Sequence, residues 1–234
     1  MGKMSWDERY QNTWEGEVRE PASFLKENLT KLPKGKALDL AMGVGQNAIF
    51  LAQNGYEVFG IDSSQVAVEK AKAYAKEKSV SVKAIKADLA TYTLPENEYD
   101  VILNFYFLER SLIPQIKKAL KKGGMVVFET YTMEHQKYDK PFNPDYLLQE
   151  NELLLSFIDF KILFYEEGVV ENCPDYATAR SHFVNHFITQ LSVRRNKSTA
   201  IGVTRYDCAR KKFESFEEPL IRHMRHIKNE SSLL

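Results

Sequence analysis

The stretch Ala37–Asp62, ALDLAMGVGQNAIFLAQNGYEVFGID, decides the fold. The apolar run over residues 36–41 lies between glycines and predicts a buried β-strand. Residues 46–54 predict a short helix that ends at Asn54-Gly55, and residues 56–61 predict a second strand. A strand, a glycine-rich turn, a helix and another strand form a βαβ unit, in which the two strands are parallel.

The same alternation continues along the chain. Further strands are expected over residues 80–87, 99–105, 125–129 and 160–165. The run YDVILNF at 99–105 is almost wholly apolar, which is typical of a central parallel strand covered on both faces. We therefore expect an α/β protein with a doubly wound, Rossmann-like, mostly parallel sheet of seven strands. The seventh strand is expected at Phe187–Val193, with STAIGVTRY at 198–206 as the competing candidate.

Helices are expected between these strands. Ser63 or Ser64 is the predicted N-cap of one helix. Two others are expected over residues 112–120 and over residues 145–157, the latter because of its dense leucine face. The helical spacing of apolar residues near position 25 predicts an N-terminal helical cap. The expected organisation is a cap over residues 1–35, an α/β domain that binds the cofactor over 36–195, and a basic C-terminal extension over 196–234.

The C-terminal part differs from the body in charge. Lys+Arg and Asp+Glu both number 32 in the whole chain, yet basic residues outnumber acidic ones after residue 178. Residues 216–228 predict an amphipathic helix. Three roles stay open for this tail: covering a sheet edge or a dimer interface, nucleic-acid binding through phosphates, or metal binding by His182, His186, His223 and His226. We favour the first role, and we predict no metal site.

The cysteines and the N-terminus bear on location. Cys173 and Cys208 show no C-x-x-C spacing, which favours a reduced environment. The first residues contain no apolar stretch, and no run is long enough to span a membrane. We therefore expect a cytoplasmic protein without a membrane partner, either a monomer or a homodimer.

The glycine-rich turn is a candidate ligand site. Gly43-Val44-Gly45-Gln46-Asn47-Ala48 fits the G-x-G-x-x-G/A pattern, and Asp62 ends the next strand, where a carboxylate can accept both ribose hydroxyls. Asp39, however, precedes the glycines and would repel a pyrophosphate by about 1 to 4 kcal/mol at about 4 Å. S-adenosylmethionine has no phosphate and carries a cationic ammonium and a cationic sulfonium. We therefore predict S-adenosylmethionine as the cofactor, with S-adenosylhomocysteine as product, and an NAD-dependent oxidoreductase as the disfavoured alternative.

These residues resemble the class I S-adenosylmethionine-dependent methyltransferases, and within them the group related to the tellurite-resistance methyltransferases. The resemblance extends over roughly residues 5 to 170. Besides the opening stretch it rests on WDERYQ at 6–11, KADL at 86–89, NFYFLERSL at 104–112, GGMVVFETYT at 123–132 and NPDYLLQENELLLSF at 143–157. The class I methyltransferase fold is therefore the expected form of the sheet. One departure is Gln46, where many relatives carry a basic residue.

The resemblance implies a set of cofactor contacts at successive strand ends. Asp39, Met42, Gly43 and Gly45 would hold the methionine part, Asp62 the ribose, and Ser63, Asp88 and Leu89 the adenosine. Asn104 and Phe105 would lie by the sulfonium, and Arg9 and Tyr10 would close over the site, with Arg9 pairing the methionine carboxylate.

Methyl transfer is an in-line displacement in which the enzyme mainly aligns the acceptor and excludes water. A soft sulfur, selenium or tellurium acceptor needs no base, whereas an oxygen or nitrogen acceptor that must lose a proton does. The catalytic residue is not identified by the sequence. The candidates near the right strand ends are Tyr106, Tyr131 and His135, with Glu109 and Glu129 beside them.

The sequence lacks a motif that would indicate a DNA or protein acceptor. Methyltransferases acting on amino groups of DNA or protein have an Asn/Asp-Pro-Pro-Tyr motif, whereas residues 104–107 read Asn-Phe-Tyr-Phe. We therefore predict a small-molecule acceptor. Two alternatives stay open: a non-catalytic module that binds S-adenosylmethionine and regulates a partner, and a nucleic-acid methyltransferase that uses the basic tail.

Overall fold

The computed structural model describes residues 5–12, 20–137, 143–170, 182–190, 204–207 and 212–215. Its strands are β1 (Lys36–Leu40), β2 (Glu57–Asp62), β3 (Val82–Lys86), β4 (Tyr99–Phe105), β5 (Leu120–Tyr131), β6 (Lys161–Val170), β7 (His182–Gln190), β8 (Thr204–Asp207) and β9 (Lys212–Ser215). Its α-helices are α1 (Trp6–Asn12), α2 (Ser23–Asn28), α3 (Gln46–Gln53), α4 (Gln65–Glu77), α5 (Ile113–Ala119) and α6 (Glu152–Ser156). Four 3₁₀ turns accompany them: η1 (Leu29–Lys31), η2 (Arg110–Leu112), η3 (Met133–Lys137) and η4 (Pro144–Tyr146).

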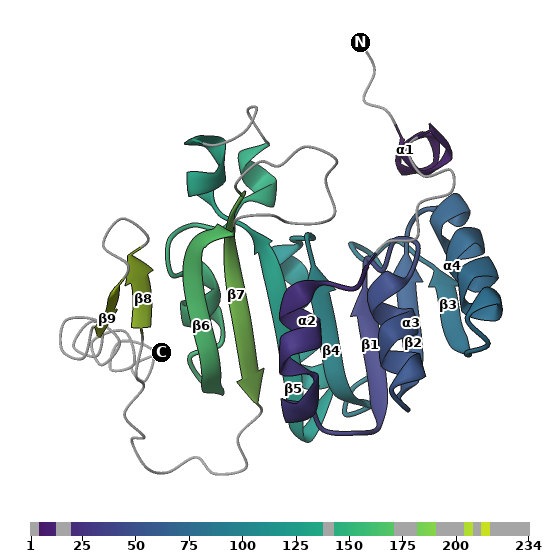
Figure 1. Cartoon of the computed structure of the whole chain (residues 1–234), viewed down its shortest axis with the longest axis horizontal. Helices are drawn as coiled ribbons and strands as arrows, with labels where there is room; N and C mark the ends of the chain where they lie inside the picture. The colour runs from purple at the N-terminus through teal and green to yellow at the C-terminus, as the bar shows by residue number, and fades with distance from the viewer. Residues whose placement is uncertain are drawn as a thin grey trace.

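The main sheet has the strand order β3-β2-β1-β4-β5-β7-β6 (Figure 1). Its first five strands are parallel neighbours, so the predicted α/β class and the parallel arrangement are confirmed. The chain order reverses between β1 and β4, which is where an open α/β sheet forms its ligand crevice. β7 pairs antiparallel with both β5 and β6. β8 and β9 form a separate antiparallel pair.

Helices cover the sheet on two faces, which we name the α3 face and the α5 face. On the α3 face, α2 and α3 pack against β1, β4 and β5 through a buried cluster that includes Phe24, Leu51 and Leu103 (Figure 1). On the α5 face, α5 and α6 bury Ile116 and Leu154 in a larger cluster. Parallel strands with both faces covered need apolar residues throughout, and β4 is buried at all but one of its positions.

Strand positions agree well with the sequence prediction. β4 has the predicted bounds, and β1, β2 and β3 lie within two residues of the expected ones. β5 is longer than predicted because Leu120 already pairs with Tyr99, so the Lys-Lys-Gly-Gly stretch belongs to the strand. β7 begins earlier than expected and ends at Gln190. The described residues of the competing candidate belong to β8, which is outside the main sheet.

The predicted helix over residues 145–157 is wrong. This segment forms η4, an extended stretch and the short helix α6. The amide of Leu148 donates to Tyr131 and its carbonyl accepts from Met133, so the segment pairs beside the end of β5. Asn151 then has a φ of 60°, which no helix interior allows. The buried leucines of the segment, Leu147, Leu148, Leu153 and Leu154, therefore lie on separate elements and not on one helical face.

The tail predictions fall mostly outside the described residues. These include the helix over 216–228, both cysteines, His223 and His226, while β8 and β9 are the described parts of the C-terminal extension. Within the described parts of the chain, no helix combines the length and apolar character that a membrane span requires.

Candidate active site

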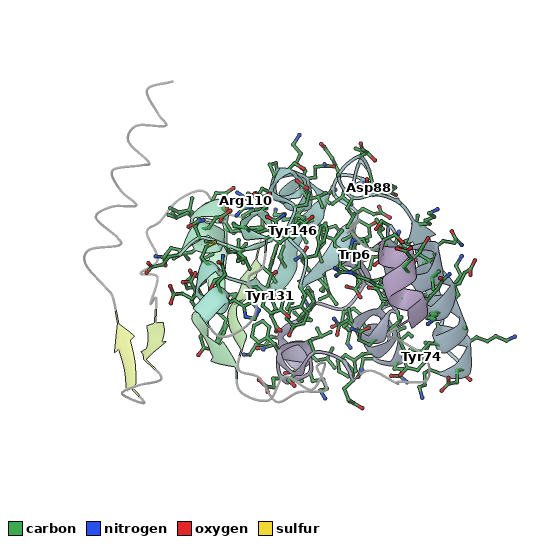
Figure 2. All side chains as sticks on the ribbon, turned by 90° about the horizontal axis from the view of Figure 1, so that it is seen from above. Trp6, Tyr74, Asp88, Arg110, Tyr131 and Tyr146 are labelled. Atoms are coloured by element: carbon green, nitrogen blue, oxygen red, sulfur yellow. The ribbon has the colours of Figure 1, made fainter. Side chains whose placement is uncertain are left out.

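The ends of the parallel strands form one edge of the sheet, seen from above in Figure 2. We divide this edge into two halves. The glycine-loop half comprises the ends of β1, β2 and β3, the loops that follow them and α1. The aromatic half comprises the ends of β4 and β5, the loops after them and residues 143–152. Trp6 and Asp88 lie on the first half in Figure 2, and Tyr131, Tyr146 and Arg110 on the second.

Asp62 organises the glycine-loop half. One carboxylate oxygen accepts from the amide of Gly43 at 2.8 Å and the other from the amide of Ser64 at 2.9 Å. Burial raises the pKa of Asp62, and the amides of Ser64 and Gly43 offset part of that shift. Asp62, which is predicted to bind the ribose, therefore also holds the glycine loop in place. Each oxygen can still accept a further hydrogen bond, because a carboxylate has about four acceptor sites.

Asp39 lies beneath the glycine loop on the α3 face. Its side chain is 2% exposed, and the amide of Ala48 at the start of α3 donates to it. The other carboxylate oxygen, Oδ2, has no hydrogen-bond partner among the described residues. Burial raises the pKa of Asp39 to about 8, and the neighbouring Asp62 adds to the shift. A buried, half-satisfied carboxylate beside a ligand loop is suited to a cationic or hydrogen-donating ligand.

The glycines of this half are required by protein packing. A Cβ on Gly43 would lie 2.8 Å from the Tyr10 hydroxyl, and one on Gly45 would lie 3.1 Å from the Cβ of Ala71. Gly45 also has a φ of 83° as the N-cap of α3. The structure shows that neighbouring side chains occupy the space at both.

Met42 points away from the edge. A Cβ on Gly60 would lie 2.1 Å from the Met42 sulfur, so the methionine fills the place that the glycine leaves. Its side chain is buried in a small cluster with Val68 and Ala71 of α4. Met42 therefore packs α4 onto β2, and only its backbone belongs to the loop.

Ala41, the first residue after β1, has a φ of 51°. A residue with a Cβ is disfavoured in this left-handed region by about 1 to 2 kcal/mol. The turn persists because the next amide, that of Met42, donates to the carbonyl of Ile61 on β2. Local strain of this kind collects at functional sites.

Helix α1 lies over the glycine-loop half (Figures 1 and 2). The Asp7 carboxylate accepts from the Ser64 hydroxyl and from the amide of Val66, and the Ser64 hydrogen bond in turn lowers the pKa of Asp7. Lys70 of α4 donates to the carbonyl of Tyr10 at 2.7 Å. Tyr10 thus lies over Gly43, whereas Arg9 is exposed and its guanidinium lies over the Trp6 ring, 4.8 Å from the ring centroid.

The adenosine candidates have different surroundings. Asp88 and Ser63 are exposed, so both side chains are accessible at the edge. One Asp88 oxygen accepts from the amide of Ala90 at 3.0 Å. Leu89 is buried in the large cluster of the α5 face, so its side chain belongs to the core.

The aromatic half brings the three catalytic candidates together. The rings of Tyr106 and Tyr131 have centroids 5.2 Å apart, and the ring of Tyr131 stacks on His135 at 4.4 Å. Tyr131 and His135 are buried, and Tyr106 is partly exposed. Tyr106 has a φ of 54°, which is strained for a bulky residue. Its amide donates to the carbonyl of Glu129 at 2.7 Å.

Asn104 and Phe105, at the end of β4, point to opposite faces of the sheet. Asn104 is paired with Phe128 on the α5 face, and its side-chain amide donates to the backbone carbonyl of Phe107 at 2.7 Å. Asn104 therefore shapes the turn after β4. Phe105 lies in the buried cluster of the α3 face, the same face as Asp39.

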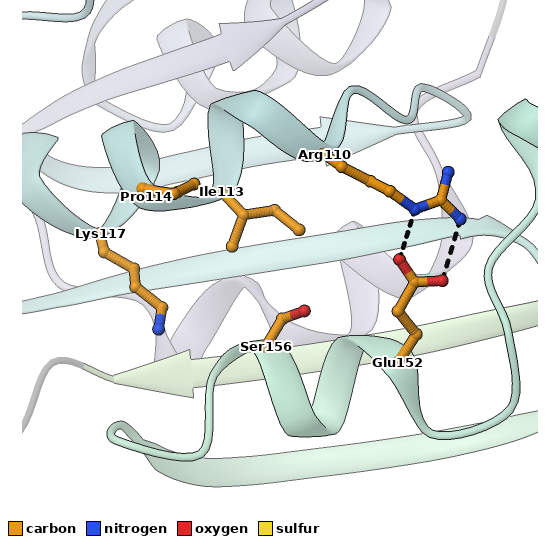
Figure 3. Close-up of a pocket in the computed structure, with 6 residues that line it drawn as sticks. All are labelled: Arg110, Ile113, Pro114, Lys117, Glu152 and Ser156. Atoms are coloured by element: carbon orange, nitrogen blue, oxygen red, sulfur yellow. Dashed lines mark hydrogen bonds and ion pairs between the residues drawn. The ribbon is translucent and has the colours of Figure 1, made fainter. Parts of the chain in front are cut away.

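Arg110 ties the aromatic half together. It pairs with Glu152 through two hydrogen bonds of 2.6 and 2.9 Å (Figure 3). It also donates to the carbonyls of Asp145 and Leu147. The neighbouring Glu109 instead caps η2 by accepting from the amide of Ser111.

A groove of about 390 Å³ runs beside this ion pair, between α5 and α6 (Figure 3). Ile113, Pro114, Lys117 and Ser156 complete its walls. These helices cover the α5 face, whereas Asp39 and Phe105 are on the other face, so the groove is separate from the candidate active site.

Sequence reasoning missed Asp7 and Ser64 as a connected pair. The contact joins residues 57 positions apart, and no local pattern signals it. The capping geometry of Ser64, which accepts from the amide of Ala67 at 3.1 Å, was a readable signal for one half of the pair.

The strand order, the glycine loop and the acids at strand ends define a Rossmann-like nucleoside-binding domain. Residues 37–124 match the family described as a methyltransferase domain. TehB of Haemophilus influenzae, a probable S-adenosyl-L-methionine-dependent methyltransferase, is 26% identical over 144 residues, which cover 58% of this chain and 49% of TehB. Hemagglutinin 1 of Eikenella corrodens is 30% identical over 156 residues, which cover 63% of this chain and 51% of that protein.

A crystal structure of TehB from H. influenzae superposes with a TM-score of 0.65 at 20% identity, covering 80% of this chain and 66% of that one. The chain is related to TehB, and its residues 37–124 form a domain of the class I S-adenosylmethionine-dependent methyltransferases. It spans about half the length of the curated relatives it matches.

Proposed function

We propose that this protein transfers the methyl group of S-adenosylmethionine to a small molecule. The observation that carries the proposal is the buried Oδ2 of Asp39, which lacks a hydrogen-bond partner among the described residues. It lies under the glycine loop, where the ammonium of the cofactor would satisfy it. A pyrophosphate offers only acceptor oxygens and would leave this atom without a donor.

The residues of the glycine-loop half fit this cofactor. Asp62 is held by two backbone amides and keeps acceptor sites for the ribose hydroxyls. Asp88 is exposed at the end of β3, where it can accept from an adenine amino group. Tyr10 and the rest of α1 lie above the loop and would exclude water from the bound molecule.

When bound, S-adenosylmethionine supplies an electrophilic methyl group on a cationic sulfur. The residues of this chain have the remaining tasks. Asp39 orients the charged end of the cofactor, and Phe105 presents an apolar wall beside it. Tyr106, Tyr131 and His135 form the wall against which an acceptor would be aligned.

Calorimetric titration with S-adenosylhomocysteine, and separately with NAD, tests the proposal. We expect micromolar binding of S-adenosylhomocysteine and no binding of NAD. Asp62→Ala should weaken the first by roughly 100-fold, because it removes the ribose contact and releases the loop. Lys83→Ala, at an exposed ion pair on β3, is the control and should bind as the wild type does. Binding of NAD alone would replace this proposal with an oxidoreductase.

A further inference from the structure

Glu129, near the end of β5, is a buried acid that the proposed cofactor contacts do not use. Its side chain is 4% exposed. It alternates along the strand with Val127 and Tyr131, and Val127 belongs to the buried cluster of the α3 face. Because side chains two residues apart in a strand share a face, Glu129 is on the α3 face, one step below the Tyr131 ring.

The sheet register relates Glu129 to the glycine loop. Glu129 pairs with Phe105, which follows Asn104, the partner of Leu40. Glu129, Phe105 and Ala41 are therefore at the same level across β5, β4 and the start of the glycine loop. Neighbouring strands lie about 4.8 Å apart, so the backbone of Glu129 is about 10 Å from that of Ala41, with Phe105 between them.

Asp39 is on the same face. It pairs with Leu103, which pairs with Val127, two residues before Glu129. β1 and β5 are two strand spacings apart, and Glu129 is two residues further along than the level of Asp39. The Cα atoms of Asp39 and Glu129 are therefore about 12 Å apart. Two buried carboxylates thus flank Phe105 from either side, and the one on Asp39 has an oxygen without a partner in the described chain.

Tyr106 links the backbone of Glu129 to the aromatic wall. Its strained backbone, with a φ of 54°, is held by the hydrogen bond from its amide to the carbonyl of Glu129. Its ring lies against Tyr131. The strained backbone of Tyr106 therefore keeps an aromatic ring close to Glu129. Backbone strain of this kind is found mostly at functional sites.

We propose that Glu129 is the base that accepts the proton of the methyl acceptor, and that the acceptor is a small neutral molecule with an O–H or N–H nucleophile. This inference rests on the proposed function. An anionic acceptor would be repelled by the carboxylate of Glu129. A soft thiolate or selenide needs no base, whereas an O–H or N–H acceptor must lose a proton, and Glu129 is a buried carboxylate on the face of Asp39 and Phe105 that can take it.

The methyl transfer forms one bond and breaks another. The lone pair of the acceptor oxygen or nitrogen forms a bond to the methyl carbon, while the bond between that carbon and sulfur breaks. The bonding pair stays on sulfur, which changes from a cationic sulfonium to a neutral thioether. The acceptor proton passes to the Glu129 carboxylate, which returns it to solvent after the product leaves.

Three probes of equal shape test the inference: 4-ethylphenol, 4-ethylaniline and 4-ethylthiophenol, the last being largely ionised at neutral pH. Methyl transfer to each is measured with the full chain, with Glu129→Gln, and with the matched control Glu96→Gln, whose side chain is in an exposed ion pair with Lys118. Binding of each probe to protein loaded with S-adenosylhomocysteine is measured by calorimetry. Affinity for S-adenosylhomocysteine itself reports on folding and on the cofactor site.

We expect the wild type to methylate the phenol or the aniline. Glu129→Gln should lower kcat for them about 100-fold or more, weaken their binding, and leave the affinity for S-adenosylhomocysteine within twofold. Transfer only to the thiophenol, transfer to none of the probes, or an unchanged Glu129→Gln variant would each overturn the inference. If Glu129→Gln does not fold, Glu129→Asp decides, because a shortened carboxylate should bind S-adenosylhomocysteine normally and still transfer at least tenfold more slowly. Failure of the wild type to bind S-adenosylhomocysteine would instead refute the proposed function.

Discussion

The two halves of the strand-end edge are built by different means. In the glycine-loop half, short hydrogen bonds from backbone amides to Asp62 and Asp39 hold the loops, and the residues involved lie within one βαβ unit. In the aromatic half, stacked rings and the hydrogen bonds of Arg110 hold together segments that are far apart in the chain. A half organised by local backbone hydrogen bonds suits an invariant cofactor, and one organised by side-chain packing can change with its acceptor.

The largest effect that would separate the halves concerns Asp39. Its pKa is about 8 in the folded protein and 3.8 ordinarily. S-adenosylhomocysteine binding to the ionised form should therefore strengthen as pH rises from 6 to 8, by up to about tenfold per pH unit. Calorimetric titrations at several pH values measure this slope. Asp39→Asn should abolish it, and a slope that persists in the variant would assign the ionisation to another group.

The same ionisation acts on the stability of the unliganded protein. Between pH 4 and 8 the folded state keeps a proton on Asp39 that the unfolded state has released. Raising the pH through this window therefore lowers the free energy of unfolding, by at most about 1.4 kcal/mol per pH unit. Urea denaturation at pH 5 and pH 8 measures the difference, which Asp39→Asn should reduce.

Arg110→Ala should affect the aromatic half alone. The variant loses a half-exposed ion pair and two hydrogen bonds to carbonyls, so the free energy of unfolding should fall by about 1 to 2 kcal/mol. Affinity for S-adenosylhomocysteine should stay within twofold. Chemical denaturation and calorimetry on the same sample check both values. A tenfold loss of affinity would mean that the halves are coupled.

Asp7→Ala should affect the glycine-loop half alone. It removes the contacts from α1 to Ser64 and Val66, so α1 should hold the cofactor less well. We expect faster dissociation of S-adenosylhomocysteine, by about threefold to tenfold, as the loss of one or two hydrogen bonds implies. Stopped-flow displacement measures the rate. The control is Glu8→Ala, on the same helix but bonded only to Ser5 in the described structure, and an equal effect there would point to general loosening of α1.

Ala41→Gly should have the smallest effect. Glycine adopts a φ of 51° without the clash of a Cβ, so the variant should gain up to about 1 kcal/mol in the free energy of unfolding. Urea denaturation measures the change. A loss of stability would show that the Ala41 side chain packs more favourably than its backbone conformation costs.

The sequence alone determined the parallel sheet and the position of the ligand loop. Apolar runs of strand length, broken by Gly43, Gly45 and Asn54-Gly55, are local signals, and local signals suffice for β1, α3 and β2. The acids at positions 39 and 62 could be assigned to one edge because parallel strands end there. The choice of S-adenosylmethionine followed from the charge of Asp39.

The tertiary structure decided the rest. Only the folded chain showed that Met42 packs into Gly60 and that Glu152 is the partner of Arg110, since these contacts join separate elements. The leucines of residues 145–157 have helical spacing, yet hydrogen bonds to the end of β5 divide the segment. Tertiary pairing outweighs local helix propensity, which is worth only a few tenths of a kcal/mol to about 1 kcal/mol per residue. The register that places Glu129 opposite Phe105 is likewise a property of the sheet, because strand pairing is set by burial of whole faces and not by any one strand.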